Sequence, residues 1–209
     1  MSYRIAVLVS GEGSNLQAIL DKLHGKDGIE VVGVGSNRAD ARGLGRAQRA
    51  EVETGVFDAG DFGGDRVLRD RLLGDWLDER SPDLIVLAGF MEILSPEFMR
   101  RFQGKVINVH PSLLPAFRGI HAIEKALDYG VRVTGVTVHF VDEGVDSGPI
   151  ILQQALELPY SAGLEAIEES VHAIEHDLLP RAIRLLASGA VRIDPDNPRR
   201  VLIEERADV

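Results

Sequence analysis

Short apolar runs alternate with segments of helical periodicity through the first half of the chain. The runs are rich in β-branched residues or leucine, as buried strands are, and they occupy positions 5–9, 29–34, 55–57, 84–88 and 106–109. The segment between the first two runs has one apolar face of helical spacing, made by Leu16, Ile19, Leu20 and Leu23. This alternation predicts an α/β fold, an open, mostly parallel, twisted sheet with helices on both faces.

Two further helices are predicted in this half. One covers roughly residues 39–51, although Gly43 and Gly45 interrupt it. The other ends at Ser81-Pro82 and has an apolar set made by Val67, Leu68, Leu72 and Trp76.

The pattern changes after residue 130. Residues 134–141 alternate between apolar and polar, and a second apolar run at 150–152 follows without an intervening helix. Two consecutive strands predict an antiparallel edge to the sheet. A long helix is then expected from residue 164 to at least 178, with a kink at Pro180, and a β-ribbon tail is expected over 191–203.

Composition narrows the class of protein. The 209 residues suffice for one large domain with a small C-terminal appendage. Lys and Arg number 23 against 33 Asp and Glu, and a net charge of −10 argues against binding nucleic acid. There is no cysteine, which excludes disulfides, thiolate nucleophiles and cysteine-bound metals. The N-terminal apolar stretch, 5–9, is too short for a signal sequence or a membrane span, so a cytoplasmic protein is expected.

The first unusual motif is Ser10-Gly-Glu-Gly-Ser-Asn15, which joins the first strand to the first helix. Two glycines and a helix start with free N–H groups favour an anion. The motif lacks the third glycine of a dinucleotide site and the lysine of a P-loop. Ser14 and Gln17 have the spacing of a capping box, so helix capping is a second interpretation, compatible with phosphate binding.

The second motif is "NVHPSLLP", residues 108–115. Asn108 and His110 are two apart at a strand end and are expected to point to the same side. An amide donor beside an imidazole suits an oxyanion and proton transfer, although a histidine before a proline can be purely structural. The loop 142–148 supplies carboxylates that could raise the pKa of His110. Because no G-x-S-x-G elbow is present, direct transfer between two bound substrates is favoured.

Four ordered motifs carry a resemblance to a known family: "VLVSGEGSNLQAIL", "VLAGFMEILSP", "INVHPSLLPAFRG" and "GVTVHFVDEGVDSGPIILQ". From about residue 3 to about residue 187 the chain resembles the phosphoribosylglycinamide formyltransferases, folate-dependent enzymes of purine synthesis. The resemblance implies a formyltransferase domain over 1–187. Its N-terminal half, 1–100, would bind phosphate and its C-terminal half, 101–187, would bind folate, leaving 188–209 as a β-ribbon tail.

The resemblance also implies the reaction and the site residues. The amine of glycinamide ribonucleotide attacks the formyl carbon of 10-formyltetrahydrofolate, the cosubstrate, and no metal takes part. The implied catalytic set is Asn108, His110 and Asp146. The implied ribonucleotide set is Gly11, Gly13, Ser14, Asn15 and Glu175. The implied folate set is Arg66, Met91, Glu92, Ile93, Leu94, Asn108, Val141, Asp142, Glu143 and Asp146. Arg66 alone reads equally well as a solvated helix residue, and Glu92 stands where the family carries a basic residue.

Other functions are weighed against this one. A formyltetrahydrofolate hydrolase is expected to have an additional N-terminal domain and no Gly-Ser-Asn loop, and formylation of methionyl-tRNA requires a further C-terminal domain and a basic surface. A nonenzymatic nucleotide-binding module lacks its fingerprint here. His172 to His176 fit the zinc motif H-x-x-E-H but lack a third ligand. The expected partners are the two small substrates, without nucleic acid or membrane, for a monomer or homodimer.

Overall fold

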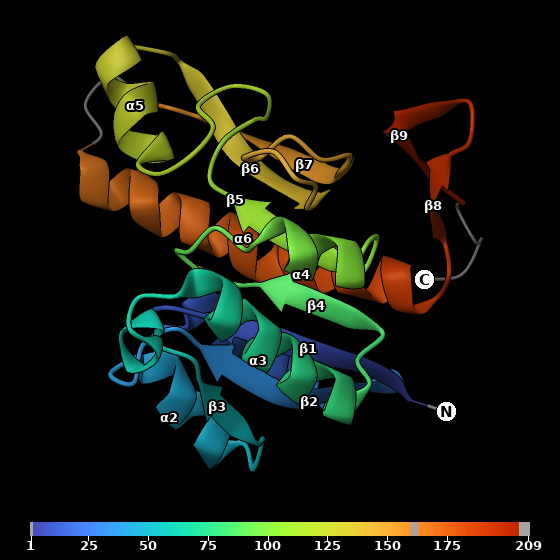
Figure 1. The fold of residues 1–209 in the computed structure, drawn as a ribbon. Helices are drawn as coiled ribbons and strands as arrows, with labels where there is room; N and C mark the ends of the chain where they lie inside the picture. The colour runs from blue at the N-terminus through green and yellow to red at the C-terminus, as the bar shows by residue number, and fades with distance from the viewer. Residues whose placement is uncertain (1, 160–162, 205–209) are drawn as a thin grey trace. The chain divides into compact units, whose positions relative to one another are not determined.

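The computed structural model describes residues 2–159 and 163–204, and the chain divides into two compact units, residues 1–107 (unit 1) and residues 108–209 (unit 2) (Figure 1). The strands are β1 (Tyr3–Val9), β2 (Ile29–Ser36), β3 (Thr54–Val56), β4 (Leu84–Leu87), β5 (Val106–His110), β6 (Val133–Phe140), β7 (Ile150–Glu157), β8 (Val191–Asp194) and β9 (Asn197–Ile203). The helices are α1 (Ser14–Leu23), α2 (Arg42–Arg49), the 3-10 helix η1 (Ala59–Phe62), α3 (Arg66–Arg80), α4 (Pro96–Arg101), α5 (Ala122–Tyr129) and α6 (Leu164–Ala187).

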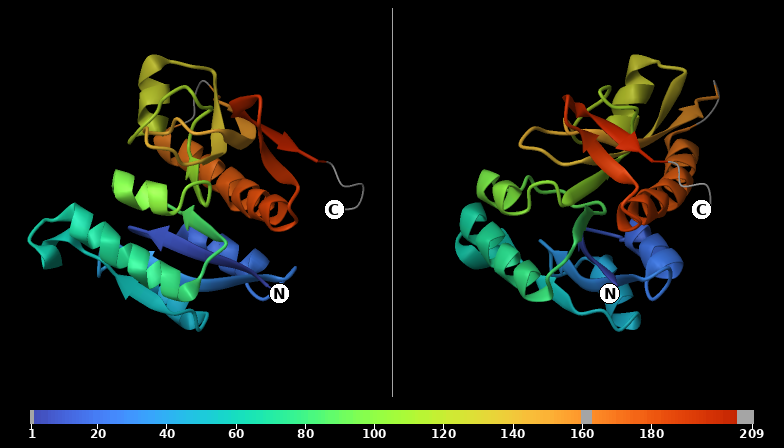
Figure 2. Two further views of the ribbon diagram at one scale, coloured as in Figure 1. Left: turned by 45° about the vertical axis from the view of Figure 1, so that its right-hand side comes forward. Right: turned by 90° about the vertical axis from the view of Figure 1, so that its right-hand side faces the viewer.

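Unit 1 is built on parallel strands in the order β3-β2-β1-β4. Residues 5–9 of the central strand β1 are fully buried. Figure 2 shows α1 and α3 on opposite faces of these strands, which explains why the run is apolar on both sides. On the α3 side, a Cβ at Gly33 would lie 2.7 Å from the Trp76 ring, so the glycines of β2 allow α3 to pack closely.

Unit 2 begins at Asn108, inside β5, and its strands follow the order β5-β6-β7. The strand β7 is antiparallel to β6, with pairs from Val133↔Glu157 to His139↔Ile150. The long helix α6 contacts β6, β7 and α5, and it continues through Pro180, which is buried. Because β6 is covered in this way, it is buried along almost its whole length.

These arrangements confirm the predicted α/β fold class, with parallel strands in unit 1 and an antiparallel edge in unit 2. The tail forms an antiparallel ribbon of β8 and β9, as the sequence predicts for residues 191–203. Among the described residues, no helix is both long enough and apolar enough to cross a lipid bilayer.

The predicted capping box at the start of α1 is wrong. The N-cap is Gly13, and no side chain caps the helix. Ser14 is already the first helical residue, because the chain enters α1 through the left-handed backbone of Gly13 (φ 72°). The side chain of Gln17 instead donates to Asp21 Oδ1 at 2.9 Å.

The predicted helix over 67–80 is present as α3, and Trp76 of its predicted apolar set packs against β2, but the other three members are exposed. Val67, Leu68 and Leu72 are 37–48% exposed. The buried positions include the charged pair Arg69 and Asp70. Neutralisation of each charge by the other lets this pair replace apolar side chains inside, a possibility that apolar periodicity does not register.

Candidate active site

The loop between β1 and α1, residues 10–15, is fixed by its glycines. A Cβ at Gly13 would lie 2.7 Å from the Cα of Gly43, and the left-handed backbone of Gly13 strains any side chain there. The Gly43 amide donates to the Gly11 carbonyl at 3.0 Å. A Cβ at Gly11 would meet no atom within 4 Å, so that side of the loop is open. The loop therefore presents accessible backbone at the positive end of α1, which favours an anion.

Two arginines of α2 hold this loop through Glu12. Arg46 donates from Nε to the Glu12 carbonyl and from Nη2 to Glu12 Oε1, both at 2.8 Å, and from Nη1 to Gln17 Oε1 at 3.2 Å. Arg42 Nη1 lies 3.0 Å from Glu12 Oε2. Hydrogen bonds from Arg46 and then Arg42 lower the pKa of Glu12. We call Glu12, Gln17, Arg42 and Arg46 the clasp, because these four side chains fix the loop.

A buried serine joins the loop to the predicted folate segment of unit 1. Ser10 Oγ donates to Asn37 Oδ1 at 2.6 Å and accepts the Met91 amide at 2.8 Å. The Ser10 amide donates to the Gly89 carbonyl at 3.0 Å. The start of the segment 91–94 is therefore held against the end of β1.

The segment 91–94 combines one charged residue with three apolar ones. Met91 and Ile93 are each 71% exposed, whereas Leu94 is buried. The Glu92 carboxylate lies 3.7 Å from Arg66 Nε. Exposed apolar side chains next to an exposed guanidinium match a ligand with an aromatic body and an anionic tail, such as a folate.

Glu92 also faces a second, buried arginine. Its carboxylate is 3.8 Å from Arg69 Nη1, and Arg69 Nε donates to Asp70 Oδ1 at 2.6 Å. Asp70 Oδ2 accepts the Ser95 amide at 2.6 Å, at the N-cap of α4. Nη1 and Nη2 of Arg69 are buried and have no hydrogen-bond partner among the described residues. Through Glu92 and Asp70, Arg69 thus helps to position the segment 91–94 and the start of α4.

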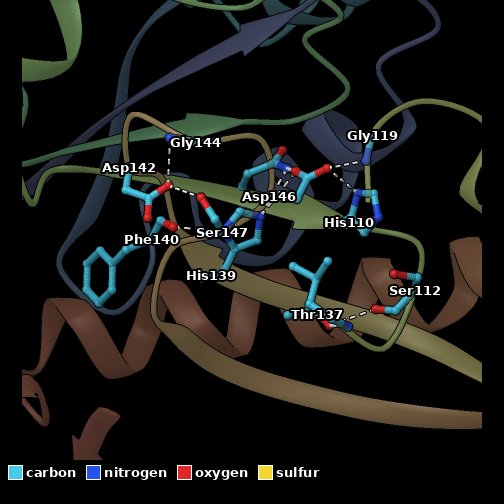
Figure 3. A network of polar contacts seen from close by, with 12 residues as sticks. His110, Ser112, Gly119, Thr137, His139, Phe140, Asp142, Gly144, Asp146 and Ser147 are labelled. Carbon is cyan, nitrogen blue, oxygen red and sulfur yellow. Dashed lines mark hydrogen bonds and ion pairs between the residues drawn. The ribbon is translucent and has the colours of Figure 1, made fainter. Parts of the chain in front are cut away.

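The predicted catalytic residues converge in unit 2 around the carboxylate of Asp146, and Figure 3 shows His110 and His139 beside it. Asp146 Oδ2 is 3.4 Å from His110 Nδ1, and Asp146 Oδ1 accepts Asn108 Nδ2 at 3.4 Å. His139 on β6 completes the group, with Nε2 at 3.3 Å from Asn108 Nδ2 and 3.6 Å from Asp146 Oδ1. We call Asn108, His110, His139 and Asp146 the cluster. The polar atoms of the cluster lie 3.3–3.6 Å apart, which is long for hydrogen bonds.

Hydrogen-bond geometry assigns the protons of the two histidines. His110 Nε2 lies 2.9 Å from the carbonyl oxygen of Phe117, which only accepts, so the neutral ring carries its proton on Nε2. Its lone pair is then on Nδ1, facing Asp146. His139 Nδ1 lies 2.8 Å from the Phe140 carbonyl, so its lone pair is on Nε2, facing Asn108.

The charges of the cluster are set by burial and by neighbours. Burial lowers the pKa of His110 below 6.5, although the Asp146 charge and the Phe117 carbonyl act in the opposite direction. Burial would raise the pKa of Asp146, but the interaction with the His139 side chain, the hydrogen bond from the Gly119 amide and the nearby His110 lower it to about 2. At neutral pH the cluster therefore combines a neutral His110 with an ionised Asp146.

The loop that follows β5 supplies the backbone partners of His110 and Asp146. The Gly119 amide donates to Asp146 Oδ2 at 2.7 Å, and Phe117 supplies its carbonyl to His110. Thr137 of β6 pins the start of this loop, because its hydroxyl donates to the Ser112 carbonyl at 2.7 Å and accepts the Leu114 amide at 3.1 Å. The Leu114-Pro115 bond is cis.

The loop 141–148 carries Asp146 and the predicted folate residues of unit 2. Asp142 Oδ1 accepts the Gly144 amide at 3.1 Å and the Ser147 hydroxyl at 2.6 Å (Figure 3). Val141 and Asp142 are partly exposed, and Glu143 is exposed. The loop is therefore closed by its own hydrogen bonds while several of its side chains remain accessible.

The remaining predicted residues are distributed over both units. Glu175 is buried on α6 in unit 2, whereas Gly11, Gly13, Ser14 and Asn15 belong to unit 1. Of the zinc-like motif on α6, His172 and His176 stack with ring centroids 6.3 Å apart. Within residues 2–159 and 163–204, no group of three or more His, Asp or Glu side chains is arranged to hold a metal ion.

Sequence reasoning missed several of these groups. His139 lies on the polar side of the alternating segment 134–141, a side that is normally solvated, yet it is 1% exposed here. A histidine on that strand near the loop 142–148 was an available signal. Arg46 and Arg69 had none, because surface arginines in helices are common and only the fold brings these two to Glu12 and Glu92.

Comparisons with known proteins agree with this geometry. The formyl transferase family matches residues 3–183. The chain is 41% identical to phosphoribosylglycinamide formyltransferase of Haemophilus influenzae over 91% of this chain and 90% of that protein. It is 46% identical to the trifunctional purine biosynthetic protein adenosine-3 of Bos taurus, again over 91% of this chain, but it spans only 19% of that longer relative.

Solved structures give the same result. The fold is similar to glycinamide ribonucleotide transformylase 1 of Symbiobacterium toebii, with a TM-score of 0.92, 43% identity, and coverage of 98% of this chain and 95% of that one. It is also similar to phosphoribosylglycinamide formyltransferase of Coxiella burnetii, with a TM-score of 0.90, 38% identity, and coverage of 97% and 94%. This chain therefore belongs to the phosphoribosylglycinamide formyltransferase family.

Proposed function

We propose that this chain transfers the formyl group of 10-formyltetrahydrofolate to the amine of N1-(5-phosphoribosyl)glycinamide in purine biosynthesis. The products are N2-formylglycinamide ribonucleotide and tetrahydrofolate. The observation that carries the proposal is the convergence of Asn108, His110 and Asp146. Family membership supports the same reaction.

His110 handles the proton. The amine nitrogen forms a bond to the formyl carbon and must lose a proton, while the folate nitrogen that leaves must gain one. A neutral His110 with its lone pair on Nδ1 accepts the first proton and supplies the second. In the charged interval, both ring nitrogens face acceptors, Asp146 Oδ2 and the Phe117 carbonyl, which stabilise the imidazolium.

Asn108 and Asp146 act on charge. The formyl oxygen becomes negative when the amine adds, and the Asn108 amide is a donor that stabilises it. Its bonds to Asp146 and His139 are long, at 3.4 and 3.3 Å, so exchange for a better acceptor costs little. Because the pKa of Asp146 is about 2, the carboxylate stays ionised and holds the imidazolium throughout.

Binding follows the chemistry of the two substrates. The open backbone of the loop 10–15 receives the ribose phosphate at Gly11, Gly13, Ser14 and Asn15, and Glu175 is assigned to the same ribonucleotide. The folate takes the exposed Met91 and Ile93, with Glu92 and Leu94 flanking them and Arg66 facing its anionic tail. In unit 2, Val141, Asp142, Glu143 and Asn108 complete the folate set. We further propose that the protein acts in the cytoplasm, as a monomer or homodimer, and without a metal.

A two-tube assay tests the proposal. The protein is incubated with glycinamide ribonucleotide and 10-formyltetrahydrofolate, and release of tetrahydrofolate is followed by absorbance. The second tube omits the ribonucleotide. Product in the first tube alone supports transfer, product in both tubes indicates hydrolysis, and product in neither rejects the proposal.

A further inference from the structure

The C-terminal ribbon is joined to the loop that carries Asp146. Arg199 on β9 donates from Nη2 to the Ser147 carbonyl at 2.8 Å, and Ser147 directly follows Asp146. The strand β9 also contacts β7, and Figures 1 and 2 show the red ribbon beside β7. The family match ends at residue 183, before the ribbon begins. The ribbon therefore reaches the loop that carries Asp146 from outside the matched region.

Ser147 is held from two directions. Its hydroxyl donates to Asp142 Oδ1 at 2.6 Å, which closes the loop on itself. Its carbonyl accepts from Arg199, which ties the closed loop to the ribbon. The loop is also tightly folded, because a Cβ at Gly148 would lie 1.8 Å from the Phe140 carbonyl. Of these ties at Ser147, only the one from Arg199 comes from outside the loop.

The backbone of Asp146 needs such support. Its φ of 47° lies in the left-handed region, which is unfavourable for a residue other than glycine. The side chain has to reach the Gly119 amide at 2.7 Å and His110 at 3.4 Å at the same time. A backbone that relaxed toward the extended region would carry the carboxylate away from both partners.

The ribbon is a firm base for Arg199 because its turn is bonded at both ends. Asp194 is buried, its Oδ1 accepts the Asp196 amide at 3.0 Å, and its Oδ2 accepts Arg200 Nε at 2.6 Å. The Arg199 amide donates to Asn197 Oδ1 at 3.1 Å. The turn 194–197 and Arg199 are therefore linked by hydrogen bonds.

We propose that the C-terminal ribbon braces the catalytic loop, with Arg199 as a positioning residue that holds Asp146 against His110 through the Ser147 carbonyl. The catalytic part of this inference rests on the proposed function; the structural part does not. Arg199 touches no reacting atom. Its effect on catalysis comes from the position in which it holds the Asp146 carboxylate.

The test compares Arg199→Met with Arg192→Met in the full chain. Arg192 lies on the same ribbon, opposite Leu202, and pairs with Glu204 at 3.4 Å rather than with the loop, so its loss perturbs the ribbon but leaves the bond to Ser147 in place. In Arg199→Met we expect kcat to fall about tenfold, the size expected for a small misplacement of a catalytic group, with both KM values within about twofold. Arg199→Lys retains a donor and should recover part of kcat. Arg192→Met should match the original protein.

An NMR titration of His110 provides a readout that does not depend on turnover. Asp146 raises the pKa of His110, whereas burial, His139 and Lys125 lower it, so displacement of Asp146 should lower it further. The pKa in Arg199→Met should fall between those of the original protein and Asp146→Asn. An unchanged pKa and kcat, or equal changes in Arg192→Met, would overturn the brace. If the original protein transfers no formyl group, the titration still decides the structural part.

Discussion

The clasp of unit 1 and the cluster of unit 2 both hold charged groups, but they are bonded differently. Arg46 and Arg42 reach Glu12 at 2.8–3.0 Å. In the cluster, the polar atoms of Asn108 and Asp146 and their histidine partners are 3.3–3.6 Å apart. In the proposed reaction the loop 10–15 would bind a phosphate that stays unchanged, so this loop would benefit from short, permanent bonds. Groups that exchange partners during turnover benefit from long ones, which tighten when substrate arrives.

The looseness of the cluster is confined to its side chains. The backbone around it is tied at short distances, from the Gly119 amide to Asp146 at 2.7 Å and from Ser147 to Asp142 at 2.6 Å. Thr137 holds the loop after β5 at 2.7 Å. The frame is therefore as firm as the clasp, while the atoms assigned to chemistry remain free to rebond. Preorganisation of this kind is what electrostatic catalysis requires.

The largest expected effect separates the two regions by function. In His110→Ala we expect kcat to fall by about 10²- to 10⁴-fold, the usual contribution of a positioned proton-transfer group, with little change in the KM for ribonucleotide. His172→Ala is the control, because His172 is exposed on α6 and belongs to neither region. Circular dichroism checks the fold. Activity within a few-fold of the original in His110→Ala would remove the assigned role.

The next effect is one of pH. Because burial lowers the pKa of His110 and the neutral ring accepts the proton, kcat should stay flat as pH falls to 6.5 and decline only below it, by about tenfold per unit. Asp146, with a pKa of about 2, remains ionised over this range. A decline in kcat that begins above pH 6.5 would contradict the neutral assignment.

The same shifts predict the acid stability of the fold. The pKa of Asp146 is depressed from 3.8 to about 2, so its contribution is present above pH 3.8 and is lost as pH falls toward 2. The pKa of His110 is also depressed, so the unfolded chain takes up that proton first and stability begins to fall below pH 6.5. Urea midpoints between pH 7 and pH 2 measure both losses. In His110→Ala, the loss of stability that begins below pH 6.5 should disappear.

A smaller effect is expected when the loop 10–15 is distorted by a substitution. Gly13→Ala introduces a Cβ 2.7 Å from Gly43 Cα on a left-handed backbone. We expect a cost of about 1–3 kcal/mol in stability and a rise of about tenfold in the KM for ribonucleotide, with kcat nearly unchanged. In Gly11→Ala the added Cβ meets no atom, so the melting temperature should be unchanged. A higher KM for ribonucleotide in Gly11→Ala, without a loss of stability, would indicate that the ligand packs directly against Gly11.

Much of the fold was readable from the sequence because buried strands leave apolar runs, and the ends of those runs located the polar residues. Asn108 and His110 follow this rule at the end of β5. Ser14 and the face of α3 do not. In the first case a glycine conformation replaced a side-chain cap, and in the second a buried ion pair replaced apolar residues.

Within the site, what the sequence could not predict came from contacts between distant segments. His139 reaches Asn108 across β5 and β6, and Arg199 reaches Ser147 over 52 positions. Arg69 lies 3.8 Å from Glu92 only because the fold brings α3 next to the segment 91–94. No local pattern encodes such pairs, since each partner alone resembles an ordinary polar residue.

The smallest expected effect lies at Glu92, where an acid sits between an exposed and a buried arginine, at 3.7 Å from Arg66 and 3.8 Å from Arg69. Glu92→Gln removes the charge that competes for Arg66, so the KM for 10-formyltetrahydrofolate should fall about two- to threefold, less at high salt, where the attraction is screened. Stability should drop by about 1 kcal/mol, because the buried Arg69 loses a nearby anion. Glu97→Gln is the matched control, since Glu97 pairs with Arg71 at 3.8 Å and neither effect should appear there. A higher KM in Glu92→Gln would mean that Glu92 contacts the folate as a hydrogen-bond acceptor, which would make the segment 91–94 resemble the cluster in its chemistry rather than the clasp.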